Sequence, residues 1–172
     1  MIDLDVRFQV RKEKMTEIGF ERFLSPFSLE LTKVADIRKL PPFSVVSSSD
    51  VELLREAAKS RNAVLLYNKG FQADVGLIRD LVGKKKAFEI PVAPLLESSG
   101  IARATLMTRM RFFIKQCVHL RAPIVITSQA RDSFGLKSPH ELIAIGEALG
   151  LTHEQAEWAI SETPEMILHA AD

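Results

Sequence analysis

The side chains that could perform acid–base or metal chemistry are three carboxylates on predicted strands, Asp3, Asp5 and Glu89. Asp3 and Asp5 alternate, so they share one face of their strand. Paired carboxylates in such positions can bind Mg²⁺, although this signal is weak. The four histidines have neither the His-x-His nor the His-Glu-x-x-His spacing of metal sites. Because a glycine-rich phosphate loop and a nucleophile elbow are also absent from the sequence, we predict no catalytic residue and no bound metal.

The stretch from Arg103 to Arg131 is unusual because it holds six Lys or Arg residues and no Asp or Glu. The stretch from Ser138 to Asp172 shows the reverse, with seven acids and no Lys or Arg. A net charge of only +1 hides this segregation. Segregated charge indicates either two surfaces with different partners or two solvated helix faces.

A long helix is predicted over residues 102–120, at the start of the acid-free stretch. Arg111, Lys115 and His119 follow one another at intervals of four residues and therefore form one cationic stripe. Phe112 projects from the polar side of the same helix. An exposed aromatic beside a cationic stripe suits phosphate contacts with base stacking, or a protein anchor. The alternative is an ordinary surface helix with one misplaced phenylalanine.

Length and composition predict one globular domain over residues 1–172. The lone Cys117 lies in an apolar helical pattern, which predicts a small buried hydrophobic residue and excludes an internal disulfide. The first ten residues are too acidic, and their apolar run too short, for a signal peptide. No apolar run approaches the roughly 20 residues that a membrane span needs. We therefore expect a cytoplasmic protein without membrane contact.

Short β-rich runs alternate with helical patterns along the chain, as in the buried runs "AVLLYN" and "APIVITS". This alternation predicts parallel βα units and an α/β fold. We expect a closed or nearly closed barrel, with an open doubly wound sheet as the alternative. Capping boxes at "SPHE" and "THEQ" predict two helix starts, and "TPE" predicts a short third helix with proline at its first position.

Two arginines follow predicted strands directly, in the loops that build the functional face of α/β barrels. Arg103 comes after the "ESSG" loop, and Arg131 comes after "VITS". We expect both to converge with Lys137 on that face. The alternative is that each arginine is structural and binds loop carbonyls.

The segment from Phe88 to Leu168 resembles the archaeal ribonuclease P protein component 3 family, the counterpart of the eukaryotic thirty-kilodalton ribonuclease P subunit. The matching pieces, in order, are "FEI" with "PLL", the basic helix from Arg103, "IVITSQAR", "LKSPHEL", "LG" before an amphipathic helix, and "ETPEMIL". They cover about half of the chain. Before Phe88 only the strand–helix rhythm matches, and that region is shorter than is usual for the family.

The resemblance implies a TIM-like barrel similar to the PHP/amidohydrolase barrels, and the short first half allows for shortened or missing outer helices. Those related enzymes use His/Asp clusters for metals, which this sequence lacks. The implied role is therefore a non-catalytic subunit of ribonuclease P, whose RNA removes the 5′ leader of precursor tRNA. The implied partners are ribonuclease P RNA, protein component 2, the other protein components and precursor tRNA. The RNA would require Mg²⁺, whereas the chain itself would bind no cofactor and would be inactive alone.

The predicted RNA contacts are cationic residues whose phosphate contacts suit recognition of structured RNA by shape. They are Arg103, Arg109, Arg111, Lys115, Arg131 and Lys137, with Lys84, Lys85 and Lys86 as outliers. Two other functions remain open. One is a metal-dependent phosphoesterase of the PHP-like barrel class, and the other is a protein-interaction scaffold without RNA contact of its own.

Overall fold

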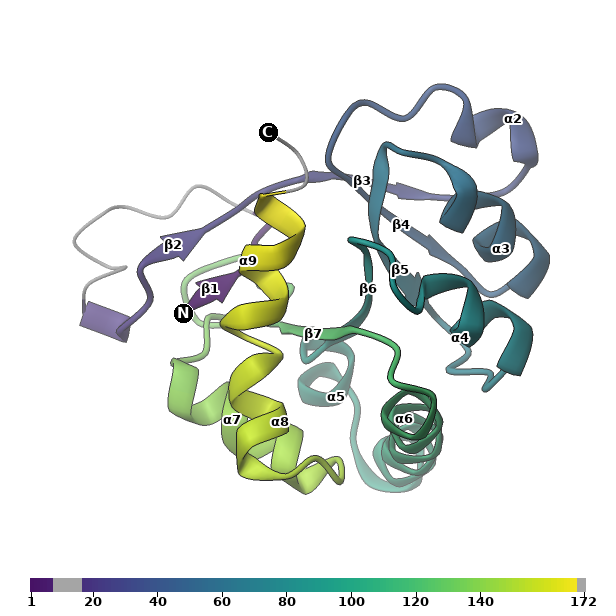
Figure 1. The fold of residues 1–172 in the computed structure, drawn as a ribbon. Coiled ribbons are helices and arrows are strands. Elements are labelled where there is room, and N and C mark those ends of the chain that lie inside the picture. Colours follow the sequence, from purple (N-terminus) through teal and green to yellow (C-terminus); the bar gives the residue numbers. More distant parts are fainter. Residues whose placement is uncertain (8–16, 170–172) are drawn as a thin grey trace.

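The structure is a computed structural model that describes residues 1–7 and 17–169, in which strands alternate with helices (Figure 1). The strands are β1 (Ile2–Asp3), β2 (Arg22–Phe23), β3 (Phe27–Glu30), β4 (Ser44–Ser48), β5 (Ala63–Asn68), β6 (Ala87–Pro91) and β7 (Ile124–Thr127). The helices are α2 (Val34–Ile37), α3 (Val51–Lys59), α4 (Val75–Leu81), α5 (Ala93–Glu97), α6 (Gly100–Leu120), α7 (Pro139–Ala148), α8 (His153–Trp158) and α9 (Glu162–Leu168). The predicted βα alternation is confirmed.

The strands form a ring of parallel pairings. Five of them make one sheet in the order β3-β4-β5-β6-β7, and β1 pairs with β2. β2 and β3 follow each other closely in the sequence. This segment therefore pairs with β1 through β2 and with β4 through β3. Beyond β7, the Ile126 amide donates to the Ala159 carbonyl at 3.1 Å, and the Ile2 amide donates to the Ile160 carbonyl at 2.8 Å. Residues 159–160 thus join β7 to β1, which confirms a TIM-like barrel over an open doubly wound sheet.

Alternating side chains on the central strands form two apolar layers. The outer layer packs against the helices and contains Val46, Leu66, Phe88 and Ile126. The inner layer, from the preceding positions on the same strands, contains Val45, Leu65, Ala87 and Val125. These continuous apolar runs are typical of parallel strands that are covered on both faces.

Most outer helices are short, from four residues in α2 to ten in α7, as the resemblance allowed. The exception is α6, with 21 residues, which buries Met110, Phe113, Ile114 and Cys117. The Phe113 ring meets the Phe88 ring edge to face, with centroids 5.0 Å apart, and so anchors α6 on β6. Burial also raises the pKa of the Cys117 thiol. No described helix combines the length and apolarity that crossing a membrane requires.

Two local predictions need correction. The capping boxes of α7 and α8 are present as predicted, but α9 begins at Glu162, so Pro164 occupies its third position. The expected strand-to-loop passage before Arg103 instead contains α5, because Pro94 within "VAPLL" suits the first turn of a helix. Arg103 therefore follows a helix–helix turn.

Candidate functional site

Toward the carboxyl ends of its strands, the inside of the barrel becomes polar. Side chains two residues apart on a strand share a face, so the inner apolar layer is followed by a second inner layer. That layer consists of Ser47, Tyr67, Glu89 and Thr127. The carboxyl ends of the strands are where α/β barrels build their functional sites. The sequence therefore places hydroxyl and carboxyl groups at the functional mouth of this barrel.

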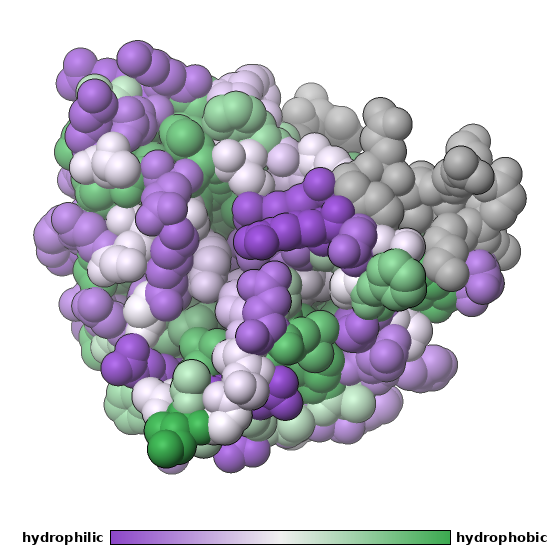
Figure 2. All heavy atoms as spheres, turned by 180° about the vertical axis from the view of Figure 1, so that it is seen from behind, coloured by the Kyte–Doolittle hydropathy of each residue, from purple (hydrophilic) through white to green (hydrophobic). Residues whose placement is uncertain are grey.

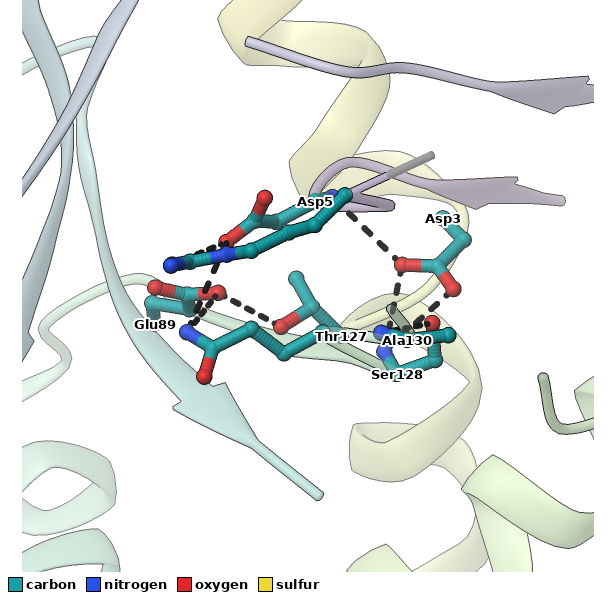
Figure 3. Close-up of polar contacts among 8 residues, drawn as sticks. Asp3, Asp5, Glu89, Thr127, Ser128 and Ala130 are labelled. Atoms are coloured by element: carbon teal, nitrogen blue, oxygen red, sulfur yellow. Dashed lines mark hydrogen bonds and ion pairs between the residues drawn. The ribbon is translucent and has the colours of Figure 1, made fainter. Parts of the chain in front are cut away.

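A polar network joins β1, β6 and β7 at this level (Figure 3). Glu89 accepts from the Thr127 hydroxyl at 2.7 Å and from the Gln129 amide at 3.3 Å. Asp5 accepts from two nitrogens of the Arg7 guanidinium, at 2.9 and 3.2 Å. Nε2 of Gln129 also lies 3.5 Å from Asp5 and bridges the two carboxyl groups. The network thereby links strands that are distant in the sequence.

Asp3 has a separate role beside this network, because both its oxygens face the backbone just after β7. They accept from the Ser128 amide at 3.2 and 3.3 Å, and one of them also accepts from the Asp5 amide at 3.4 Å. Nearby, the Arg7 amide donates to the Ala130 carbonyl at 2.7 Å. Asp3 therefore ties β1 to the end of β7, where the barrel closes.

Burial changes the ionisation of these carboxyl groups. It raises the pKa of Asp3 to about 7, although hydrogen bonds from Ser128 oppose the rise. Burial, and then the negative charge of Asp5, raises the pKa of Glu89 well above its usual range. Within the described residues, Oε2 of Glu89 and Oδ1 of Asp5 have no hydrogen-bond partner. The raised pKa of Glu89 favours its neutral form, which lowers the cost of burying this carboxyl group close to Asp5.

The weak magnesium signal from Asp3, Asp5 and Glu89 has only a partial counterpart in space. Asp5 and Glu89 converge, whereas Asp3 turns to the Ser128 backbone. In the part of the chain that the structure describes, no group of three or more His, Cys, Asp or Glu side chains is placed to hold a metal ion. The geometry gives these acids the task of holding strand ends together.

Among the predicted RNA contacts, Arg103 and Arg131 both lie beside the turn between α5 and α6. The Arg103 guanidinium donates to the carbonyls of Ser98 at 2.8 Å and Leu96 at 3.5 Å. Arg131 lies 3.8 Å from the Glu97 carboxylate. The structure therefore brings the two arginines to one corner, and both side chains are exposed there.

Arg109, Arg111 and Lys115 occupy exposed positions on α6. Arg111 donates from two nitrogens to the Ala148 carbonyl, at 2.9 and 2.7 Å, and so ties α6 to the end of α7. Phe112 is 57% exposed, which confirms that it projects away from the core. It lies between Arg109 and Lys115 around the helix, three residues from each. This part of α6 presents two cations and an aromatic ring to solvent.

The remaining predicted lysines lie in two other places. Lys137 donates to the Leu136 carbonyl at 3.1 Å, in the loop before α7. Lys84 and Lys85 are exposed before β6, while Lys86 is half-buried and donates to a carbonyl of α3's end. Burial lowers the pKa of Lys86 to about 8. Because this turn precedes a parallel strand, it lies at the amino end of the barrel, opposite the mouth.

Two cationic residues at the mouth, Arg7 and Lys69, were not among the predicted contacts. Arg7 continues the inward alternation of Asp5, and Lys69 continues that of Tyr67 beyond β5. Lys69 lies 2.5 Å from the Glu30 carboxylate. The alternation of inward and outward side chains predicts both positions, because each residue lies just after the carboxyl end of a parallel strand and on its inward face.

Figure 2 shows the side that is turned away in Figure 1, where α5 is one of the distant elements. Hydrophilic side chains gather in the middle of this face, and hydrophobic side chains gather below them. Near the Arg103 corner, α5, α6 and the loop before α7 expose the apolar residues Leu96, Ile101 and Phe134. This corner therefore combines cations with apolar surface.

Comparison with known proteins identifies relatives. A family model described as RNase P subunit p30 matches residues 30–172. Ribonuclease P protein component 3 of Methanosarcina acetivorans is 30% identical over 130 residues, or 72% of this chain and 54% of that protein. The same component of Methanothermobacter thermautotrophicus is 27% identical over 140 residues, or 78% of this chain and 57% of that protein. The chain thus spans little more than half the length of these curated relatives.

A chain in a cryo-EM structure of archaeal ribonuclease P with mature tRNA has the same fold, with a TM-score of 0.73 and 19% sequence identity. The match covers all of this chain and 80% of that one. The family match also reaches well before Phe88, into the region where the sequence showed only a strand–helix rhythm.

Proposed function

The chain belongs to the RNase P subunit p30 family, and on that premise we propose that it is a non-catalytic protein subunit of ribonuclease P. Its role is to bind and stabilise the catalytic RNA, which removes the 5′ leader from precursor tRNA. The observation that carries the proposal is the family match over residues 30–172. The isolated chain is inactive, and cleavage requires the RNA with its Mg²⁺.

The exposed cations of α6 support an RNA contact. Arg109 and Lys115 have neither a hydrogen bond nor an ion pair within the described residues, so both can approach phosphates without losing a partner. Phe112 between them offers a ring for base stacking. Arg103 and Arg131 form the second contact, at the corner beside α5, and Lys137 adds a third in the loop before α7.

The proposed partners follow from the same premise. They are ribonuclease P RNA, protein component 2, the other protein components and precursor tRNA, all in the cytoplasm. The apolar residues near the Arg103 corner suit a protein neighbour beside the RNA. A metal-dependent phosphoesterase is not proposed, because no described site favours it.

The RNA contact on α6 is tested with the double variant Arg109→Gln/Lys115→Gln, measured by binding to a ribonuclease P RNA over a range of salt concentrations. Each lost phosphate contact is expected to weaken binding and to reduce the slope of log affinity against log salt by about 1. The matched control is Arg38→Gln/Lys39→Gln, which removes the same charges from exposed positions after α2. Equal salt slopes for the two variants would show that α6 does not contact the RNA.

A further inference from the structure

The mouth of the barrel contains a cavity of about 330 Å³ at the carboxyl ends of its strands. Its wall is built from residues that β1, β3, β4, β5 and β7 or the segments after them contribute. A second hollow of about 320 Å³ shares Gln129 and Arg131 with it. This volume lies in the range of small-ligand sites, roughly 300–1,000 Å³.

Cationic side chains outnumber anionic ones on the wall of this cavity. Arg7, Lys69 and Arg131 contribute three positive charges, and Glu30 contributes one negative charge. Asp5, behind the wall, holds the Arg7 guanidinium in a fixed orientation through two hydrogen bonds. These cations follow the ends of three separate strands and line one space, which is the arrangement that a multivalent anion requires.

Hydroxyl groups complete the wall, and they offer donors to a ligand. The Ser28 hydroxyl is buried and has no hydrogen-bond partner among the described residues. Ser47 and Tyr67 also line the cavity. Burial raises the pKa of Tyr67 to about 12, so its phenol keeps its proton and can donate. The lining therefore favours a ligand that is rich in acceptor oxygens.

We propose that the barrel mouth binds a phosphate ester of nucleotide size, with the phosphate between Arg7, Lys69 and Arg131 and the sugar against the hydroxyl groups. The phosphate can belong to a free nucleotide or to a terminal nucleotide of an RNA, because the recognition chemistry is the same. The site lies inside the barrel mouth and does not depend on the α6 surface, and it shares only Arg131 with the corner contact proposed above.

The test is an NMR titration of the full chain with adenosine monophosphate, inorganic phosphate and adenosine. Adenosine monophosphate is expected to shift the amides of Ser47, Tyr67 and Gln129 with saturation, and phosphate is expected to compete with it. Adenosine at the same concentrations is expected to leave these amide signals unshifted. Lys69→Gln should weaken nucleotide binding at least tenfold, whereas the exposed Lys39→Gln should not change it.

A 5′-phosphorylated trinucleotide RNA distinguishes the two sources of the phosphate. Tighter binding of the trinucleotide than of adenosine monophosphate assigns the site to an RNA end, and the reverse assigns it to a free nucleotide. Adenosine binding as well as its monophosphate, no saturable binding, or equal affinity in the Lys69→Gln and Lys39→Gln variants would each overturn the proposal. None of these outcomes bears on RNA binding through Arg109 and Lys115, which the salt slopes measure separately.

Discussion

At the scale of single residues, the predicted RNA contacts differ in how far the protein itself already uses them. Arg103 and Arg111 donate to main-chain carbonyls and hold neighbouring elements together. The Arg131 guanidinium lies 3.8 Å from the Glu97 carboxylate, and such an exposed ion pair contributes little to the free energy of folding. The structural alternative, an arginine that binds loop carbonyls, is thus present for Arg103, whereas Arg131 has a carboxylate partner instead. An arginine has five N–H donors, so a carbonyl contact leaves others for phosphate.

Neutralising the corner arginines together, as Arg103→Gln/Arg131→Gln, should reduce precursor-tRNA cleavage by the holoenzyme most at low Mg²⁺. We expect a loss of roughly tenfold there, because these cations replace part of the divalent ion atmosphere around folded RNA. Cleavage rates over a Mg²⁺ series measure the effect. Arg103→Lys/Arg131→Lys keeps the charge and is the control. An equal loss at every Mg²⁺ concentration would contradict the explanation.

Asp3 makes stability depend on pH, because its folded-state pKa is about 7 against an ordinary value of 3.8. The folded protein therefore holds this proton more tightly than the unfolded chain does. Protonated Asp3 therefore adds up to about 4 kcal/mol to the free energy of unfolding below about pH 4, and this contribution is lost as the pH rises to 7.

Asp3→Asn keeps the acceptor for the Ser128 amide and removes the titration. Urea unfolding of both proteins between pH 4.5 and 8 measures the difference. The free energy of unfolding of the wild type is expected to fall with rising pH relative to that of the variant. Parallel pH profiles would mean that Asp3 is not held in its protonated form.

The sequence placed Asp3, Asp5 and Glu89 on strands but could not assign their partners. The alternation of side chains predicts which face of a strand a residue occupies, but not which residue it meets across the barrel. Whether two carboxyl groups converge depends on strand order, which comes from pairings between segments far apart in the chain. For the same reason, the sequence alone did not single out Arg7 and Lys69.

At the scale of elements, local sequence signals were sufficient to predict helix boundaries where the stabilising contact is itself local. The Ser138 and Thr152 capping boxes fixed the starts of α7 and α8, because both partners lie within four residues. The apolar helical pattern correctly predicted that Cys117 is buried in α6 and that Phe112 lies outside the core. The start of α9 was wrong by two residues, since proline is tolerated throughout a first helical turn.

The packing of α7 on β7 rests on the absence of a side chain at Gly146. An added Cβ would lie 2.7 Å from Cδ1 of Ile126 and 2.9 Å from Cβ of Ala156. Gly146→Ala is therefore expected to destabilise the protein by about 1–2 kcal/mol, although alanine favours a helix by roughly 1 kcal/mol. Thermal or urea unfolding measures the change.

A second substitution checks the cause. Ile126→Val removes the Cδ1 atom that the new methyl group would meet, so it should cost less in the Gly146→Ala background than in the wild type. Additive losses, or a Gly146→Ala protein more stable than the wild type, would show that α7 has room to move away from the barrel.

At the scale of the whole molecule, the barrel closes through a segment that carries no strand signal. Residues 159–160 join β7 to β1 with two backbone hydrogen bonds, and two residues are too few for a periodic pattern. The alternation of strands and helices predicted the parallel architecture and favoured a closed barrel, and the resemblance implied the same form. The amino end carries the lysine turn before β6, while the carboxyl end carries the polar mouth and the arginine corner.

The most direct test of the proposed subunit role is precursor-tRNA cleavage at low Mg²⁺. It compares this chain alone, ribonuclease P RNA alone, and the RNA with this chain and protein component 2. We expect cleavage only in the last mixture, because the RNA supplies the chemistry and the proteins offset its charge. Cleavage by the purified chain alone, abolished by a chelator, would contradict the account and direct attention to Asp5 and Glu89 as metal ligands.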